Sequence, residues 1–133
     1  MPASALSTPV DSFGRNTLRE QFVHILFTEA TWIRALQSLE YRRWEDEPQR
    51  LDQIVAKKKE VAAATAAYLN SQSQADLNRE VDRVPAYWVG PRRTPAFICH
   101  HAFTHTFHHK GQIAAMFRLL GYPLPDSDLQ RQE

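Results

Sequence analysis

Histidine is concentrated toward the C-terminal end of this chain. Five of the six histidines lie between Cys99 and Gly121, in the sequence CHHAFTHTFHHKGQIAAMFRLLG. At about 100° per helical residue, the middle of the broadest apolar side of this stretch carries four of them and a glutamine: His101, His105, His108, His109 and Gln112. Of the five, His100 alone points elsewhere. Buried imidazoles need hydrogen-bond partners or a metal ion, so the stripe predicts a binding face.

The spacing of two of these histidines suits a divalent ion. His105 and His109 stand four residues apart, so their rings project from adjacent turns of one helix face. Neutral imidazole is a ligand for zinc, nickel, copper and iron(II). A third ligand must come from another element, and His24 is the one histidine outside the C-terminal cluster. Three histidines would leave positions for water or substrate, which is the pattern of a catalytic zinc site.

A second interpretation of the stripe needs no metal. The histidines would then form a polar seam, hydrogen bonded to water and to Thr28, Glu29 and Gln112. Other kinds of site fit less well. Thr106 follows His105, so the H-E-x-x-H motif of zinc proteases is absent, as is a glycine-rich phosphate loop. We expect Cys99 to be a small buried residue rather than a nucleophile.

Long helices must position these residues. Thr17 and Glu20 have the form of a capping box. A helical period continues from there to about Glu40, with His24 at the edge of its apolar arc. Pro48 suits the first turn of a second helix, which runs to about residue 70. The first of these helices therefore carries the third candidate ligand.

The remaining helix follows a less regular stretch. Ser73 could cap a short helical turn, and valine, tyrosine and tryptophan in residues 79–93 predict extended strands or a small hairpin. Thr94 as cap and Pro95 at the first helical position then begin a third long helix, which Gly121 ends. The histidine cluster lies on this helix.

Composition excludes several classes of protein. The chain has 133 residues, of which 43% are hydrophobic and 23% charged, which is typical of a single globular domain. A formal net charge of +1 gives no basis for a nucleic-acid surface, and no apolar run approaches the roughly 20 residues of a membrane span. One cysteine cannot form an internal disulfide, so we expect a cytoplasmic location.

Two segments resemble those of a known family. The sequence HAFTHTFHHKGQIAAMFRLLGYP is similar to the C-terminal signature of DinB-like (DNA-damage-inducible) metal-binding bundles, H-x-F-N-H-x-x-H-H-R-G-Q. FVHILFTEATWIRAL is similar to the H-I-x-x-x-E-x-x-W helix of that family, and the resemblance covers roughly residues 12–125. Thr104 and Lys110 depart mildly from the signature, which often has asparagine and arginine there.

The resemblance implies a fold and a cofactor. By it, His24, His105 and His109 correspond to the metal triad of an all-α, up-down helical bundle of the DinB/YfiT-like type. Zinc or nickel is the expected ion, with iron or manganese as alternatives. Such bundles usually have a long helix before the one that corresponds to residues 17–40, whereas only 16 weakly patterned residues stand there. We therefore expect three main helices and a short hairpin-like segment, with the usual first helix missing.

Domain boundaries and a partner follow from this expectation. Residues 1–16 would be a loose lead-in, 17–125 the bundle domain and 126–133 a tail. The face of the third long helix opposite the histidines carries four apolar residues: Phe103, Phe107, Ala114 and Phe117. Because three helices bury one such face more easily than two, we expect a twofold homodimer. The alternative is that residues 79–93 and the lead-in cover this face.

Members of the DinB-like family include thiol-dependent S-transferases and isomerases that act with bacillithiol, mycothiol or glutathione. The resemblance therefore implies a metal-dependent thiol S-transferase acting on small electrophiles. Glu29 and His108 are the nearest candidates for supporting the ligands or handling protons. A metal-dependent hydrolase, in which the ion activates water, and a non-catalytic metal-binding stress-response protein are the alternatives.

Overall fold

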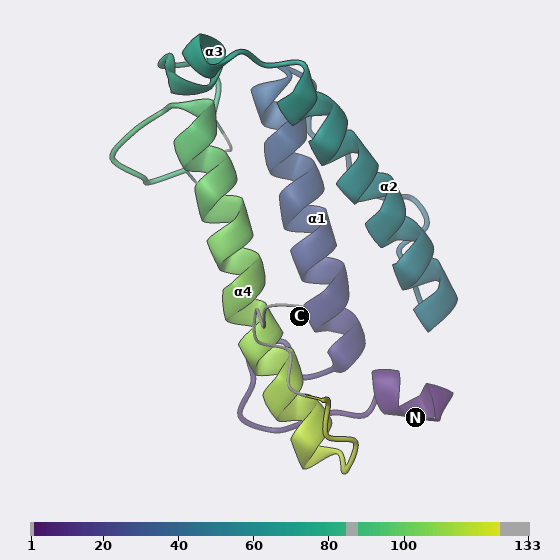
Figure 1. Cartoon of the computed structure of the whole chain (residues 1–133). Coiled ribbons are helices and arrows are strands. Elements are labelled where there is room, and N and C mark those ends of the chain that lie inside the picture. The colour runs from purple at the N-terminus through teal and green to yellow at the C-terminus, as the bar shows by residue number, and fades with distance from the viewer. Residues whose placement is uncertain (1, 85–87, 126–133) are drawn as a thin grey trace, which may run out of the picture.

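The computed structural model describes residues 2–84 and 88–125. Along the chain these form a short 3₁₀ helix, η1 (Ala3–Leu6), and four α-helices: α1 (Leu18–Leu36), α2 (Leu51–Asn70), α3 (Gln74–Asn78) and α4 (Pro95–Leu119). No strand occurs among the described residues. The predicted all-α bundle with three long helices is confirmed (Figure 1). None of the described helices is both long and apolar enough to span a bilayer.

Local capping sets where α1 begins and ends. Glu20 N donates to Thr17 Oγ1 and Thr17 N donates to Glu20 Oε2, both over 3.1 Å, which confirms the predicted capping box. The helix stops at Leu36, short of the expected Glu40. The reason is Ser38, whose φ of 58° turns the chain into the left-handed region and ends the helical hydrogen bonds.

The start of α2 differs from the sequence-based prediction. Pro48 is not in the first turn of α2, because the helix begins three residues later at Leu51. The side-chain oxygen of Gln53 accepts hydrogen bonds from the backbone N–H groups of Gln49 (2.9 Å) and Arg50 (3.0 Å). This fixes the helix N-terminus at Arg50 and leaves Pro48 buried in the connection.

The connection between α2 and α4 is irregular. Ser73 caps α3 through a hydrogen bond from Asp76 N, as its sequence predicted. The expected hairpin has no strands among the described residues. The chain nevertheless folds back on itself here, because Val81 N donates a 3.0 Å hydrogen bond to Arg93 O. The centre of that hairpin, residues 85–87, lies outside the described residues. Thr94 and Pro95 then begin α4, as predicted, and Gly121, with φ of 82°, follows its end.

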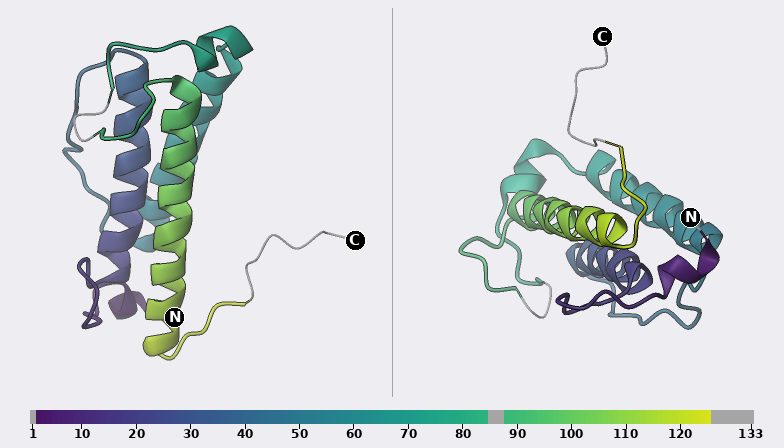
Figure 2. Two further views of the ribbon diagram at one scale, coloured as in Figure 1. Left: turned by 90° about the vertical axis from the view of Figure 1, so that its left-hand side faces the viewer. Right: turned by 90° about the horizontal axis from the view of Figure 1, so that it is seen from below.

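Helix α1 is the centre of the bundle. It packs against both α2 and α4, and Figures 1 and 2 show these two helices on different sides of it. The main core is formed by eight buried residues: Leu6, Val10, Leu18, Ile25, Leu26, Ile54, Ile113 and Met116. Burial of such side chains contributes about 1.5–3 kcal/mol each. The α1–α4 contact thereby brings the two histidine-bearing helices face to face.

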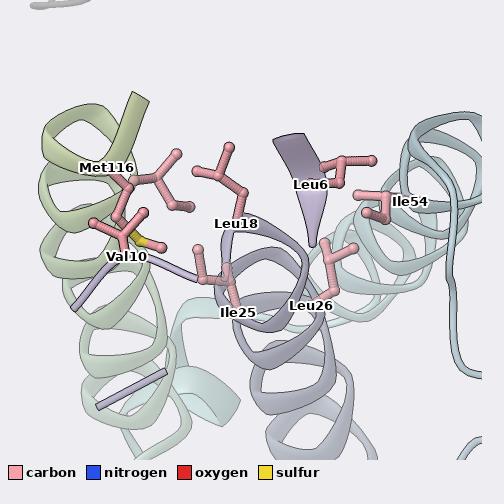
Figure 3. Packing of buried hydrophobic residues seen from close by; sticks show 8 residues of the cluster. Leu6, Val10, Leu18, Ile25, Leu26, Ile54 and Met116 are labelled. Atoms are coloured by element: carbon pink, nitrogen blue, oxygen red, sulfur yellow. The ribbon is translucent and has the colours of Figure 1, made fainter. Parts of the chain in front are cut away.

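The N-terminal segment belongs to this core. The sequence predicts a loose lead-in over residues 1–16, whereas in the structure Leu6 and Val10 are only 3% and 8% exposed. Figure 3 shows Leu6 beside Ile54 of α2 and Val10 beside Met116 of α4. The segment therefore packs across the end of the bundle from α2 to α4. It covers core residues although the long first helix usual in such bundles is missing.

The apolar face of α4 opposite the histidines is partly exposed and partly packed against α1. Phe103 and Phe107 are 39% and 56% exposed, so this part of the face is open to solvent as expected. Phe117 instead packs edge-on against Phe22 of α1, with ring centroids 6.5 Å apart, and joins the border of the main core. The open apolar surface on α4 is therefore smaller than the sequence suggested.

Candidate metal centre

Three histidines from two helices meet in one place. His24 projects from α1, while His105 and His109 project from adjacent turns of α4. The Nε2 atom of His105 lies 3.1 Å from that of His24 and 3.2 Å from that of His109. The possible ligand atoms all lie within 4.8 Å of one another. The structure thus brings together the three residues singled out in the sequence.

The separations between these nitrogens suit a shared ion. Two nitrogens that each lie about 2.1 Å from one ion are about 3.0 Å apart at a 90° angle and about 3.4 Å apart at the tetrahedral angle. The observed 3.1 and 3.2 Å fall between these values. A set of three imidazoles is a common ligand set for zinc and for other borderline divalent metals. The donor set therefore fits a divalent ion.

Gln21 orients one of the three rings. His109 Nδ1 donates a 2.7 Å hydrogen bond to Gln21 Oε1, and Gln21 Nε2 donates a 2.9 Å bond to Arg15 O. Gln21 is 1% exposed and the bond to His109 is buried, whereas the bond to Arg15 O is partly buried. With its proton on Nδ1, neutral His109 presents a lone pair on Nε2 toward the other histidines. Gln21 thus lies where a metal-binding histidine would need an outer hydrogen-bond partner.

Gln21 is not among the residues that the sequence pattern singles out. A signal was available, because Gln21 stands three residues before His24 and therefore on the same side of the helix. It is also a polar residue one turn from the buried Leu18. The partner of Gln21 could not be predicted from the sequence, because His109 is 88 residues away along the chain.

Burial keeps the three imidazoles neutral. It is the main cause that lowers the pKa of His24 and of His105 to about 4, and the charge of Arg15 and the neighbouring histidines lower both further. Burial also lowers the pKa of His109. At neutral pH all three rings therefore carry lone pairs, the form that binds metal.

His105 has no protein partner for its outer nitrogen. Its Nδ1 is the buried side-chain atom that lacks a hydrogen bond among the described residues. If Nδ1 carries the proton, the Nε2 lone pair of His105 lies close to the Nε2 atoms of both other histidines, which favours a cation among them, and the buried Nδ1–H still lacks a partner. If Nε2 carries it, that proton can serve one neighbouring histidine, and a buried acceptor stays unpaired. Neither protonation state satisfies the cluster without a further group.

The other histidines of the predicted stripe lie outside the triad. His101 and His108 are exposed, because α1 buries the part of the α4 surface that carries His109 and only borders the rest of that face. His101 stacks on Trp32, with ring centroids 4.8 Å apart and planes 22° apart. His108 lies beside the triad, its ring centroid 5.2 Å from that of His109, and its Nε2 is 3.1 Å from Gln112 Nε2.

Glu29 is directed toward α2. Thr65 Oγ1 donates a 2.6 Å hydrogen bond to Glu29 Oε1, and Thr65 is buried between the helices. This contact links α1 to α2, so the polar seam that joins Glu29 to the histidines is not the arrangement observed. Nearby, burial and the charge of Glu29 raise the pKa of Cys99 to about 11, which makes a thiolate there unfavourable.

The triad opens on a large cavity. A space of about 1060 Å³ is lined by His24 and His105 together with eleven further residues: Arg15, Phe27, Thr28, Thr31, Trp32, Ala35, Leu39, Glu40, Tyr41, Arg83 and Val84. A second cavity of about 390 Å³ shares Arg15, His24, Phe27 and Tyr41 with the first. Ligand sites in proteins usually measure about 300–1,000 Å³, so the larger cavity has the size of a substrate site.

Aromatic rings form two walls beside the triad. On one side Trp32 is held between the stacked ring of His101 and the edge of Trp88, the latter at a centroid distance of 6.0 Å. On the other side Phe27 meets Tyr41 edge-on at 5.8 Å and Trp44 at 5.3 Å. These contacts restrict the rings, so the cavity has apolar walls of fixed position next to the histidine nitrogens.

Comparison with known proteins gives a match over almost the whole chain. The family model described as "DinB family" matches residues 4–133, which includes both histidine-bearing helices and the N-terminal segment that packs on the core. No curated protein matches the chain.

Proposed function

From the finding that the chain belongs to the DinB family and brings three histidines within reach of one ion, we propose that it is a metal-dependent thiol S-transferase. His24, His105 and His109 would hold the divalent ion, with zinc or nickel preferred and iron or manganese as alternatives. The observation that carries this proposal is that the Nε2 atom of His105 lies 3.1 Å from that of His24 and 3.2 Å from that of His109, while His24 and His105 line a cavity.

The chain's own residues prepare the site for a ligand. Gln21 holds the His109 ring, and burial keeps His24 and His105 neutral, so the donor atoms are ready before binding. His24 and His105 also line the cavity, so a molecule within it reaches the same nitrogens. When bound, a divalent ion would lower the pKa of a thiol and supply a thiolate at neutral pH.

The cavity favours transfer between two molecules over hydrolysis. Its volume of about 1060 Å³ lies at the upper end of the range for ligand sites, which leaves room for a small thiol beside a small electrophile. Apolar rings such as Phe27 and Trp32 line it, which limits competition by water. In the proposed reaction the thiol loses its proton, its sulfur bonds to carbon of the electrophile, and the leaving group departs with the bonding electron pair. His108, exposed and beside His109, is the better placed of the two proposed proton-handling residues.

Metal analysis and activity test the proposal together. We expect about one divalent ion per chain, and conjugation of a small thiol such as 2-mercaptoethanol to 1-chloro-2,4-dinitrobenzene that a chelator abolishes and added metal restores. His105→Ala should lose both metal and activity, whereas His100→Ala, an exposed residue on the same helix, should keep both. Metal-dependent hydrolysis of 4-nitrophenyl acetate without thiol transfer would support a hydrolase instead. Metal-loaded protein without either activity would support the non-catalytic alternative.

A further inference from the structure

The cavity beside the triad contains more positive than negative charge. Its lining residues include two arginines, Arg15 and Arg83, and one acidic residue, Glu40. Among the described residues neither arginine forms an ion pair with an acidic side chain. An arginine carries five N–H donors in a planar fork that matches a carboxylate. The lining therefore offers two arginines that no acidic side chain in residues 2–84 and 88–125 pairs with.

Each arginine forms a hydrogen bond with a residue in or next to α1. The backbone carbonyl of Arg15 accepts a hydrogen bond from Gln21 Nε2, whose oxygen binds His109. Arg83 Nη1 donates a 2.7 Å hydrogen bond to Ser38 O, just after α1. This bond uses one donor of the Arg83 fork and leaves the others for a ligand. The guanidinium groups thus come from two different connections that meet at one cavity.

Besides the arginines, the cavity has an apolar surface, which is formed mainly by Trp32. Its ring lines the cavity and is held from outside by His101 and Trp88. Phe27 and Tyr41 add further apolar surface. A ligand that satisfies both parts of the lining has an anionic group for the arginines and an apolar or aromatic body for these rings.

We propose that the cavity selects a carboxylate-bearing substrate with an apolar or aromatic body, recognised by Arg15 and Arg83 and packed against Trp32. In the metal-free cavity the two arginines and Glu40 sum to a net charge of +1, which matches the single negative charge of a carboxylate better than the double charge of a phosphate. The assignment rests on the proposed function in taking this cavity as the substrate site. Recognition of the carboxylate itself does not depend on a metal ion.

A matched pair of probes isolates the charge. 4-Phenylbutanoate and 4-phenylbutanamide have nearly the same shape and differ in the carboxylate. Titration calorimetry, with tryptophan fluorescence as a second signal, would measure binding of each to the protein with its metal and after treatment with chelator. We expect the acid to bind at least about tenfold more tightly than the amide, since charge-assisted bonds exceed neutral ones, and this preference should weaken as salt is raised.

Substitutions test whether the arginines are responsible. Arg15→Gln and Arg83→Gln keep hydrogen-bonding groups but remove the charge, so the acid should bind only about as well as the amide, while amide binding stays unchanged and shows that the cavity is intact. Arg118→Gln, an exposed arginine on α4 that does not line the cavity, should retain the preference. These outcomes in chelator-treated protein would support the inference even if the chain bound no metal and transferred no thiol.

Three results would overturn the inference. The first is equal affinity for acid and amide in the wild type. The second is an acid preference that survives Arg15→Gln combined with Arg83→Gln. The third is a preference seen only with metal present and insensitive to both substitutions, because the carboxylate would then bind the ion directly. That last result would leave the proposed function standing while removing the role of the arginines.

Discussion

Replacement of Gln21 is the most direct test of how the triad is held. Gln21→Leu keeps a side chain of similar size but removes the acceptor for His109 Nδ1 and the donor to Arg15 O. The N–H of His109 would be left in a site that is 8% exposed. An unpaired buried group of this kind costs about 1–3 kcal/mol, so the metal-free protein should unfold more easily.

The larger effect should appear in metal affinity. Loss of an outer hydrogen bond to a metal-binding histidine typically weakens binding by about 10–100-fold. At a fixed metal concentration above saturation this removes about 1.4–2.7 kcal/mol of the stabilisation that metal adds to the folded state. For a chain of 133 residues, 1 kcal/mol corresponds to roughly 3–5 °C in melting temperature. The increase in melting temperature on adding zinc should therefore be smaller in Gln21→Leu by roughly 4–14 °C.

A second variant separates the two hydrogen bonds. Gln21→Glu keeps an acceptor for His109 Nδ1, replaces the donor to Arg15 O by an acceptor and adds a negative charge, so its zinc affinity should be no lower than that of the wild type even if the protein is less stable. Gln53→Leu, which removes a side chain that caps α2, controls for general loss of stability and should leave zinc affinity unchanged. Calorimetric titration with zinc and melting curves with and without zinc give both quantities. Equal zinc affinity in the wild type and Gln21→Leu would refute the argument that Gln21 prepares His109 for the ion.

Three further predictions concern the ligands, the pH and the open face of α4. His109→Ala should bind less than about a tenth of the metal bound by the wild type in elemental analysis, whereas His100→Ala should bind the full amount; stoichiometric metal in His109→Ala would contradict the triad. In metal-free protein the free energy of unfolding should fall as pH decreases from about 6.5 toward 4. In the folded state the pKa values of His24 and His105 are about 4, so both residues stay neutral over this range. In the unfolded state their pKa values are near 6.5, so the unfolded chain takes up protons and is favoured as pH falls. Denaturant titrations at several pH values would measure this slope, and the joint substitution of both residues by glutamine should flatten it. If Phe103 and Phe107 form a homodimer contact, Phe107→Asp should be monomeric in light scattering while the wild type is a dimer; a wild type that is monomeric at micromolar concentration would exclude the dimer.

Much of the framework could be predicted because its signals are local. The capping box of Thr17 and Glu20 and the pair Thr94 and Pro95 depend on neighbours within three or four residues, and both mark helix starts in the structure. The spacing of His105 and His109 likewise depends on one helix. These features needed no knowledge of how the helices pack.

Features that depend on tertiary contacts were missed. A helical wheel treats the histidine-bearing side of α4 as one face, but α1 covers only part of it, which leaves His101 and His108 exposed. The partner of Gln21 is 88 residues distant, and the burial of Leu6 and Val10 requires α2 and α4 to be in place. The early end of α1 depends on the backbone at Ser38, a residue type that does not by itself predict a left-handed conformation.

The division of the site between helices and connections has a consequence for how such a protein can diversify. The donor nitrogens lie on α1 and α4, whose packing the core fixes, whereas much of the cavity wall lies on connections: Arg15 before α1, Leu39 to Tyr41 after it, and Arg83 with Val84 before α4. Connections tolerate substitution and insertion far better than packed helices do. Changes in them could replace one substrate by another while the histidine centre is inherited intact. Relatives that share the triad need not share a substrate, and the sequences of these three connections are the place to look for the difference.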